Sequence, residues 1–241
     1  MTTSALSPVF SVQRSGERAF FEHGWLQTYH SFSFAEYVDP SNTHWGALRV
    51  FNDDAVAGGE GFPLHPHRDM EIVTYVLSGE LAHRDSLGNH GVVGPGGVQF
   101  MSAGTGVRHS EFNNKPNEPL HLVQMWVLPG QLGTPPSYGQ MDFTVEDRRN
   151  KWLTIVSGES AVEAPIRITQ TATFSVAQLE NSTLVYPFAP KRYGFLFVAS
   201  GSVEANGDAL RAGDAVRLYD VARLSVKGSG ELVLWDLPDA G

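Results

Sequence analysis

Short runs of β-branched and aromatic residues, each ended by glycine, proline, asparagine or aspartate, recur along the whole 241-residue chain. The composition supplies the turns that this pattern needs, with 25 glycines and 14 prolines. A sustained 3.6-residue apolar period is rare, and only residues 34–37 suggest a short helical turn. Regular short strands with turn signals between them predict an all-β protein built from sandwiches or closed barrels. The expected strands are residues 47–51, 72–77, 98–101, 122–128, 152–157, 195–199 and 232–237.

The same strand, glycine turn, strand pattern occurs once in each half of the chain. Residues 74–80 read Thr-Tyr-Val-Leu-Ser-Gly-Glu and precede a second glycine turn at 94–97. Residues 195–202 read Phe-Leu-Phe-Val-Ala-Ser-Gly-Ser and precede a similar turn at 210–216. An internal duplication explains both and predicts two similar barrels. Residues 130–138, rich in Gly and Pro, are the expected connector, which divides the chain into residues 1–130 and 131–241.

Charge and cysteine content exclude several classes of function. The formal net charge is −9, and a field of this sign repels phosphate backbones and anionic membranes, so neither is an expected partner. The absence of cysteine excludes disulfides, thiolate metal sites and cysteine nucleophiles. The first eight residues lack a basic region followed by an apolar run, and no apolar stretch is long enough to span a bilayer. We therefore expect a cytoplasmic protein.

The histidines are confined to the first half of the chain. All nine lie at or before His121, so only the first barrel can hold a histidine-based metal site. His65 with His67, and His109 with Glu111, form two pairs of ligand-type residues two positions apart. Residues two apart on a strand share a face, so two such pairs on facing strands would aim four ligands at one point. Three imidazoles and a carboxylate suit Fe(II), Mn(II), Ni(II), Cu(II) or Zn(II), with free positions for dioxygen or substrate.

The spacing around these pairs resembles the two cupin motifs. The first motif reads Gly59-x5-His65-x-His67-x3-Glu71-x7-Gly79, with one extra residue before the last glycine. The second reads Gly96-x5-Ser102-x-Gly104-x4-His109-x3-Asn113, with Ser for the usual Pro and one extra residue before His. More narrowly, the chain from Arg18 onward resembles the pirin family, including bacterial members described as quercetin 2,3-dioxygenases. The matching stretches are residues 30–34, 65–71, 83–86, 101–106, 109–111 and 124–126.

The resemblance implies a bicupin, with two cupin-type β-barrels in one chain. Its N-terminal barrel would bind one metal, with Fe(II) the expected ion, and its C-terminal barrel would be degenerate. The family's ligands fall on His65, His67, His109 and Glu111, and a monomer is expected. Cupins in general take the acidic ligand from the first motif, which would be Glu71. The pirin pattern and the two-residue spacing both favour Glu111, which leaves Glu71 as a strand residue beside a cation.

Other polar and aromatic residues near these motifs have less specific interpretations. His83 and Asp85 are also two apart, but they precede a turn at residues 85–89, so we expect them at the end of a hairpin. His30 either lines the mouth of the site or makes a buried polar contact. Phe32 and Phe34 are expected in the core, with an apolar pocket wall as the alternative.

The resemblance further implies a metal-dependent dioxygenase that cleaves a flavonol such as quercetin with O2 and releases carbon monoxide. Glu111 would act as both ligand and catalytic base toward this small aromatic substrate. The alternatives are a non-catalytic metal- or redox-sensing regulator that acts through a protein partner, and another activity such as that of an isomerase or hydrolase. A deep, apolar, open pocket would favour catalysis, whereas a pocket closed by side chains would favour sensing.

Overall fold

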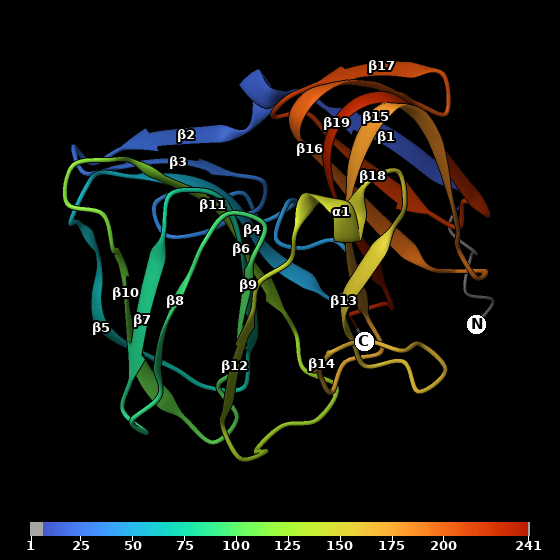
Figure 1. The fold of residues 1–241 in the computed structure, drawn as a ribbon. Helices are drawn as coiled ribbons and strands as arrows, with labels where there is room; N and C mark the ends of the chain where they lie inside the picture. Colours follow the sequence, from blue (N-terminus) through green and yellow to red (C-terminus); the bar gives the residue numbers. More distant parts are fainter. Residues whose placement is uncertain (1–6, 241) are drawn as a thin grey trace.

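The computed structural model describes residues 7–240, whose regular secondary structure is almost entirely β-strand. The exceptions are one short helix, α1 (Val145–Arg148), and one 3-10 turn, η1 (Ser15–Glu17). Figure 1 shows two barrel-like units side by side, one blue to green and the other mainly orange and red. The predicted all-β fold with two barrels is confirmed. The start of the N-terminal stretch, where no secretory signal is expected, lies outside the described residues.

The first unit combines a seven-stranded and a four-stranded sheet. The larger sheet has the order β12-β9-β6-β11-β4-β3-β2 and the smaller one β5-β10-β7-β8. The strands of the larger sheet are β2 (Ala19–Glu22), β3 (Leu26–His30), β4 (Leu48–Val56), β6 (Glu71–Ser78), β9 (Val98–Ser102), β11 (Leu120–Val127) and β12 (Ser137–Met141). Those of the smaller sheet are β5 (Gly61–His67), β7 (Leu81–Asp85), β8 (His90–Val93) and β10 (Val107–Asn113).

The second unit is one eight-stranded sheet. Its main path runs β1-β18-β16-β19-β15-β13-β14, and β17 pairs with β16 beside that path. The strands are β1 (Val9–Gln13), β13 (Leu153–Ser157), β14 (Ile166–Arg167), β15 (Thr173–Pro187), β16 (Tyr193–Ala205), β17 (Asp208–Arg211), β18 (Ala215–Tyr219) and β19 (Arg223–Leu237).

Each unit contains one strand from the other half of the chain. The N-terminal strand β1 pairs with β18, and Figure 1 shows it in blue among the orange strands of the second unit. Conversely, β12, which follows residue 130, pairs with β9 of the first unit. The expected connector, residues 130–138, therefore ends inside β12. A division into two units at residue 130 remains a proposal, and each unit includes one strand from the other side of that residue.

The two stretches that suggested a duplication fold alike. Gly96 donates its backbone N–H to the carbonyl of Val76 at 2.8 Å, and Gly213 donates to that of Val198 at 2.8 Å. Gly96 and Gly213 have φ of +80° and +86°, a conformation that glycine adopts without a steric penalty. The equivalent turns therefore explain why glycine stands at both positions.

One hydrophobic cluster joins the two units. It contains Phe51 and Met125 from the first unit and Phe195 and Trp235 from the second. The rings of Phe51 and Phe195 lie 4.7 Å apart, and the Trp235 indole donates to the Met125 sulfur at 3.0 Å. β6 is buried from Glu71 onward along most of its length, because neighbours cover both of its faces.

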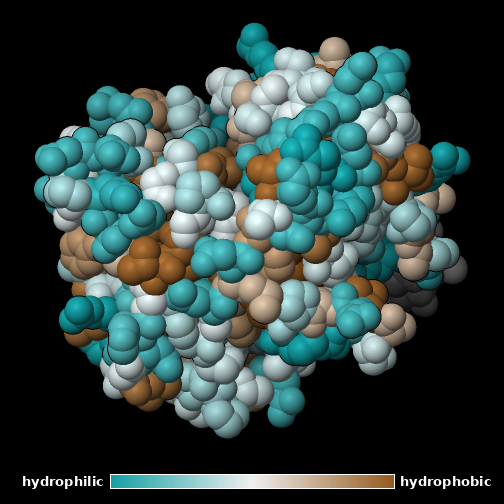
Figure 2. Space-filling model, in the orientation of Figure 1, coloured by the Kyte–Doolittle hydropathy of each residue, from teal (hydrophilic) through white to brown (hydrophobic). Residues whose placement is uncertain are grey.

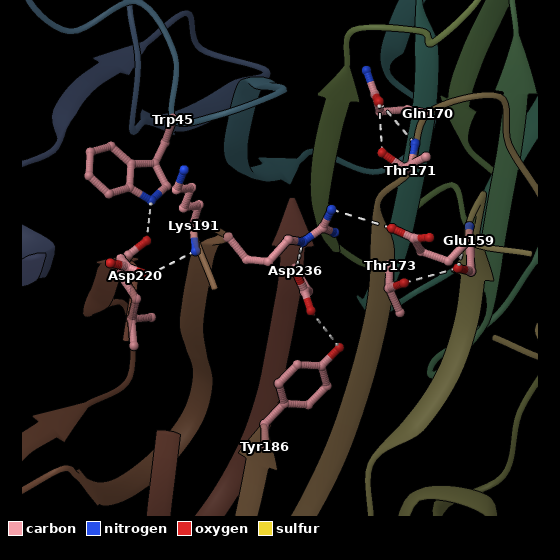
Figure 3. A network of polar contacts seen from close by, with 12 residues as sticks. Trp45, Glu159, Gln170, Thr171, Thr173, Tyr186, Lys191, Asp220 and Asp236 are labelled. Carbon is pink, nitrogen blue, oxygen red and sulfur yellow. Dashed lines mark hydrogen bonds and ion pairs between the residues drawn. The ribbon is translucent and has the colours of Figure 1, made fainter. Parts of the chain in front are cut away.

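Polar contacts continue this junction into the second unit (Figure 3). The Asp236 carboxylate accepts a hydrogen bond from Tyr186 at 3.3 Å and one from Arg192 at 2.6 Å. Arg192 also contacts Glu159 at 3.4 Å. Trp45, from the first half of the chain, donates its indole N–H to two backbone carbonyls of the second unit. The units are thus joined by hydrogen bonds as well as by apolar packing.

The segment 34–37 is not helical. Phe34 and Tyr37 exchange two backbone hydrogen bonds, 3.0 and 2.9 Å long, across a tight turn. Ala35 within the turn has φ of +48°, outside the right-handed helical region. The predicted helical turn is therefore wrong, because four residues gain more from closing a two-residue loop than from starting a helix.

The exterior of the barrels is largely polar. The face seen in Figure 2 is mostly hydrophilic, with small and separate apolar patches. This is the pattern of antiparallel sheets that turn one face to water. Within residues 7–240, no helix has the length and apolar character needed to cross a membrane.

Candidate metal centre

Three of the predicted ligands come together on β5 and β10. The strands are antiparallel, and His109 lies directly opposite His65. The ring of His109 lies 4.4 Å from that of His65 and 4.9 Å from that of His67, which are 4.8 Å from each other. One nitrogen of each ring lies within 4.8 Å of those of the other two. The facing-strand arrangement expected from the two-residue spacing is therefore present for the histidines.

The protonation of these rings suits a divalent metal. His65 donates its Nδ1–H to the carbonyl of Pro63 at 2.7 Å, which leaves Nε2 with a free lone pair. The Nε2 atom of His109 is buried without a hydrogen-bond partner in the described chain. Burial and the neighbouring histidines lower the pKa of both His67 and His109 to about 3. Three clustered imidazoles, two of them with lowered pKa values, fit a transition metal.

Glu111 lies next to this cluster but is held separately. Its side chain is buried, and its Oε1 and Oε2 atoms accept hydrogen bonds from the amides of Gln99 and Gln124, at 2.5 and 2.8 Å. A register shift between His109 and Glu111 interrupts the pairing of β10 with β5. The ligand atoms of Glu111 cluster with those of His109, outside the group that includes His65. Assigning all four residues to one metal remains a proposal.

His83 completes the second group of ligand atoms, together with His109 and Glu111. It is buried in the barrel, its Nδ1 lies 3.5 Å from Nδ1 of His109, and its ring stacks on Tyr138 at 4.3 Å. Asp85 instead caps the following turn, where its carboxylate accepts two backbone N–H groups at 2.9 Å. Both residues lie at the end of the β7–β8 hairpin as expected, but the ring of His83 also faces the interior of the barrel, which was not expected. The missing information was the strand register, which places His83 opposite Glu111.

Glu71 lies away from both groups of ligand atoms. Its carboxylate accepts hydrogen bonds from the N–H and hydroxyl of Thr169, at 2.7 and 2.8 Å, and from the N–H of Gln170 at 3.4 Å. Burial raises the pKa of Glu71. The interpretation of Glu71 as a buried strand residue is correct, but its partners are an amide-rich loop of the second unit rather than the expected cation.

A cavity of about 310 Å³ adjoins the histidines. Leu64 lines it and is 54% exposed, so the cavity reaches the surface. His30 and Phe34 also line it, whereas Phe32 is buried in the core, which decides the alternatives left open for these residues. Apolar side chains make up much of the wall: Leu26, Phe34, Phe62, Pro63, Leu64 and Trp126. A larger hollow, about 700 Å³, lies on the second unit, but its lining contains no histidine.

Comparison with known proteins identifies the family. Residues 11–127 match the family model described as Pirin, and residues 160–235 match one described as the quercetinase C-terminal cupin domain. A pirin-like protein from Caulobacter vibrioides is 44% identical over 219 residues, covering 89% of this chain and 94% of that protein. The chain belongs to the pirin family. The predicted cupin type of the two barrels is thereby confirmed.

Other pirin relatives indicate chemistry and metal binding in their own names. A protein from Escherichia coli K12 named quercetin 2,3-dioxygenase is 38% identical over 230 residues, covering 94% of this chain and 98% of that protein. The structure of the bacterial pirin YhhW from Escherichia coli, in complex with nickel(II), is 37% identical. The two structures superpose with a TM-score of 0.89, and the match covers 96% of this chain and 100% of the YhhW chain. The histidine cluster described above thus lies in a pirin with a metal-containing structural relative.

Proposed function

We propose that this pirin is a metal-dependent dioxygenase that acts on a small aromatic, flavonol-like substrate. One divalent metal, Fe(II) by expectation, would be held by His65, His67, His109 and Glu111. The clustered imidazoles, the lowered pKa values of His67 and His109, and the Nε2 of His109, which has no partner in the described chain, support this ligand set. When bound, the metal would supply the electronic activation of substrate and dioxygen. The relative named quercetin 2,3-dioxygenase supports the reaction class.

The apolar cavity that ends at the histidines is the observation that carries this proposal. Phe34 and Trp126 meet edge to face at 5.3 Å, and Trp126 meets His67 at 4.8 Å, which forms an aromatic wall beside the cluster. Such a wall binds a flat ring and excludes water from it. A cavity of about 310 Å³ suits one small molecule of this kind.

Glu111 is the proposed base. It lines the cavity, and the amides of Gln99 and Gln124 hold its carboxylate in a fixed orientation. A substrate hydroxyl that enters beside His65 and His67 would meet this carboxylate, which would take the hydroxyl proton. The same group would then serve as ligand and base, as expected from the family pattern.

Carbon monoxide release tests the reaction. Protein loaded anaerobically with Fe(II) is mixed with quercetin and oxygen, beside metal-free protein and free Fe(II). We expect CO in catalytic amounts from the loaded protein alone. CO no greater than that from free iron, repeated with Ni(II), Cu(II), Mn(II) and Zn(II), would reject the proposal.

The cavity also bears on the alternative of a non-catalytic regulator. That hypothesis predicts a site closed by side chains, whereas the exposure of Leu64 shows a cavity that reaches the surface. We therefore favour catalysis. The cytoplasmic location, the monomeric state and any protein partner remain predictions from the sequence.

A further inference from the structure

The cavity beside the histidines has one polar wall, built from β3 and β4. Four side chains form this wall, which we call the polar ladder: Thr28, His30, Asn52 and Asp54. The two strands are antiparallel, with Thr28 directly opposite Asp54 and His30 opposite Asn52. Side chains two residues apart on a strand share a face, so all four point to the same side of the sheet.

The polar ladder is buried, yet it lacks partners. The exposed fraction is 2% for Thr28 and Asp54 and 4% for His30 and Asn52. Among residues 7–240, each has a buried atom that finds no hydrogen-bond partner: Thr28 Oγ1, His30 Nδ1, Asn52 Oδ1 and Asp54 Oδ1. Buried polar groups are nearly always paired, because an unpaired one destabilises the fold. Four such atoms on one cavity wall indicate a ligand that completes them.

The neighbouring residue on β4 provides a contrast. Asp53 points to the opposite face, where its carboxylate is paired with Arg18 at 2.8 Å and His121 at 2.6 Å. Within the described residues, the same strand thus pairs Asp53 with two cationic or basic side chains and gives Asp54, which faces the cavity, no such partner. Asp54 and His30 belong to neither group of clustered ligand atoms found in the described part of the chain, which argues against a second metal site.

Aromatic rings connect the polar ladder with the histidine cluster. His30 packs edge-on against Phe34 at 5.2 Å, and Phe34 packs against Trp126 at 5.3 Å. Trp126 in turn contacts His67 at 4.8 Å, and all four residues line the cavity. A flat molecule in the cavity would contact these rings and still reach both the ladder and the histidines.

The chemistry of the polar ladder selects ligand hydroxyl groups. The Asp54 carboxylate and the Asn52 carbonyl oxygen accept hydrogen bonds, and the Thr28 hydroxyl can accept or donate. Burial lowers the pKa of His30 to about 4, so its ring is neutral at pH 7 and adds no positive charge. A wall rich in acceptor oxygens and without a positive charge pairs best with O–H donors.

We propose that the polar ladder binds hydroxyl groups of the substrate and makes the cavity selective for polyhydroxylated aromatic molecules. This inference rests on the proposed function for the identity of the substrate pocket, and it adds the residues that set specificity. A site built to bond a hydroxyl discriminates strongly against an analogue that lacks it, because the site's own polar groups are then left unpaired.

Ligand binding to the metal-free protein tests the proposal without turnover. The probes are quercetin and 3-hydroxyflavone, which keeps only the hydroxyl next to the ring carbonyl, and quenching of tryptophan fluorescence reports binding near Trp126. We expect the wild type to prefer quercetin at least about tenfold. Thr28→Val and Asp54→Ala should each reduce that preference by about threefold or more. Ser31→Ala removes another buried, unpartnered hydroxyl that lies outside the cavity lining, and it should keep the preference.

The outcomes separate this proposal from the proposed function. Equal preference in wild type, Thr28→Val and Asp54→Ala, with each variant folded by circular dichroism, would overturn the role of the ladder. Loss of preference in Ser31→Ala as well would also overturn it, because the effect would then come from general loosening. A loss of the preference for quercetin in Thr28→Val and Asp54→Ala, but not in Ser31→Ala, would support the role of the polar ladder. This would hold even if the metal-loaded protein released no CO, because that result would reject only the dioxygenase reaction.

Discussion

The Nδ1 atoms of His83 and His109 lie 3.5 Å apart inside the first barrel. The ring of His109 also lies 4.4 Å from that of His65, another candidate ligand. On its far side His83 approaches Asp85, with 3.7 Å between Nε2 and the carboxylate. His83 therefore helps to hold the orientation of His109, a proposed metal ligand, by contacting its Nδ1 atom.

Replacing His83 should weaken metal binding without abolishing it. Residues that contact and orient a metal ligand typically change the metal affinity about 10- to 100-fold. We therefore expect His83→Ala to raise the Kd for Ni(II) by about that factor. Competition with a chelator gives the value. His90→Ala, at an exposed position on β8, is the matched control and should bind as the wild type does. An unchanged Kd in His83→Ala would exclude the supporting role, and a complete loss would make His83 a ligand.

Removal of His65 or His109 should have the larger effect. Each supplies a nitrogen to the cluster, so His65→Ala and His109→Ala should lose stoichiometric metal after dialysis. Elemental analysis of the dialysed proteins measures the remaining metal. Full occupancy in either variant would contradict the site.

The two candidate carboxylate ligands, Glu111 and Glu71, can be distinguished by the property that each Gln variant loses. Glu111→Gln removes the proposed base and ligand, so we expect CO release to fall at least about 100-fold. Because one of its two hydrogen bonds with Gln99 and Gln124 is also lost, Tm should fall as well. Glu71→Gln disturbs three hydrogen bonds to Thr169 and Gln170, so we expect it to lose roughly 1–3 kcal/mol of stability and keep metal binding. The reverse pattern would assign the ligand to Glu71.

The stability of the metal-free protein should depend on pH through Asp54. Burial raises the pKa of Asp54 from 3.8 to about 7, with the carboxylates of Asp53 and Glu111 adding to the rise. Between these values the folded state keeps a proton that the unfolded state has lost, so stability falls as pH rises from 3.8 through 7. The cost above pH 7 is on the order of 4 kcal/mol.

Asp54→Asn should remove this cost. We expect thermal unfolding of the metal-free variant to show a Tm several degrees above the wild type at pH 8, and a smaller difference at pH 5. A difference that is equal at both pH values would show that Asp54 does not titrate in this range.

Local sequence patterns predicted seven of the strands, because apolar runs ended by turn residues need only near neighbours to be recognised. β6 was expected at residues 72–77 and spans Glu71–Ser78. By contrast, β19 was expected only at residues 232–237 but begins at Arg223. Glycines interrupt its apolar pattern, and they are needed because a Cβ on Gly230 would lie 2.2 Å from the carbonyl oxygen of Ser200.

The parts of the site that the sequence did not reveal depend on pairing between distant segments. The spacing of His65 and His109 could be interpreted locally, since each belongs to a two-residue pattern. His83 meets Glu111 only through the register of β7 and β10, and Asp54 meets Thr28 only through that of β3 and β4. Register depends on which strands pair, so no local pattern contains it.

The position of β1 in the second unit affects the order in which the chain can fold during synthesis. Val9–Gln13 leaves the ribosome first, but its partner β18, Ala215–Tyr219, is made roughly 200 residues later, a delay of about 10–40 s at usual rates of translation. Until then the strand has an open edge that can pair with other chains. The strands that carry the clustered histidines, β5 and β10, are both made before β18, so the pairing of β1 with β18 follows their synthesis.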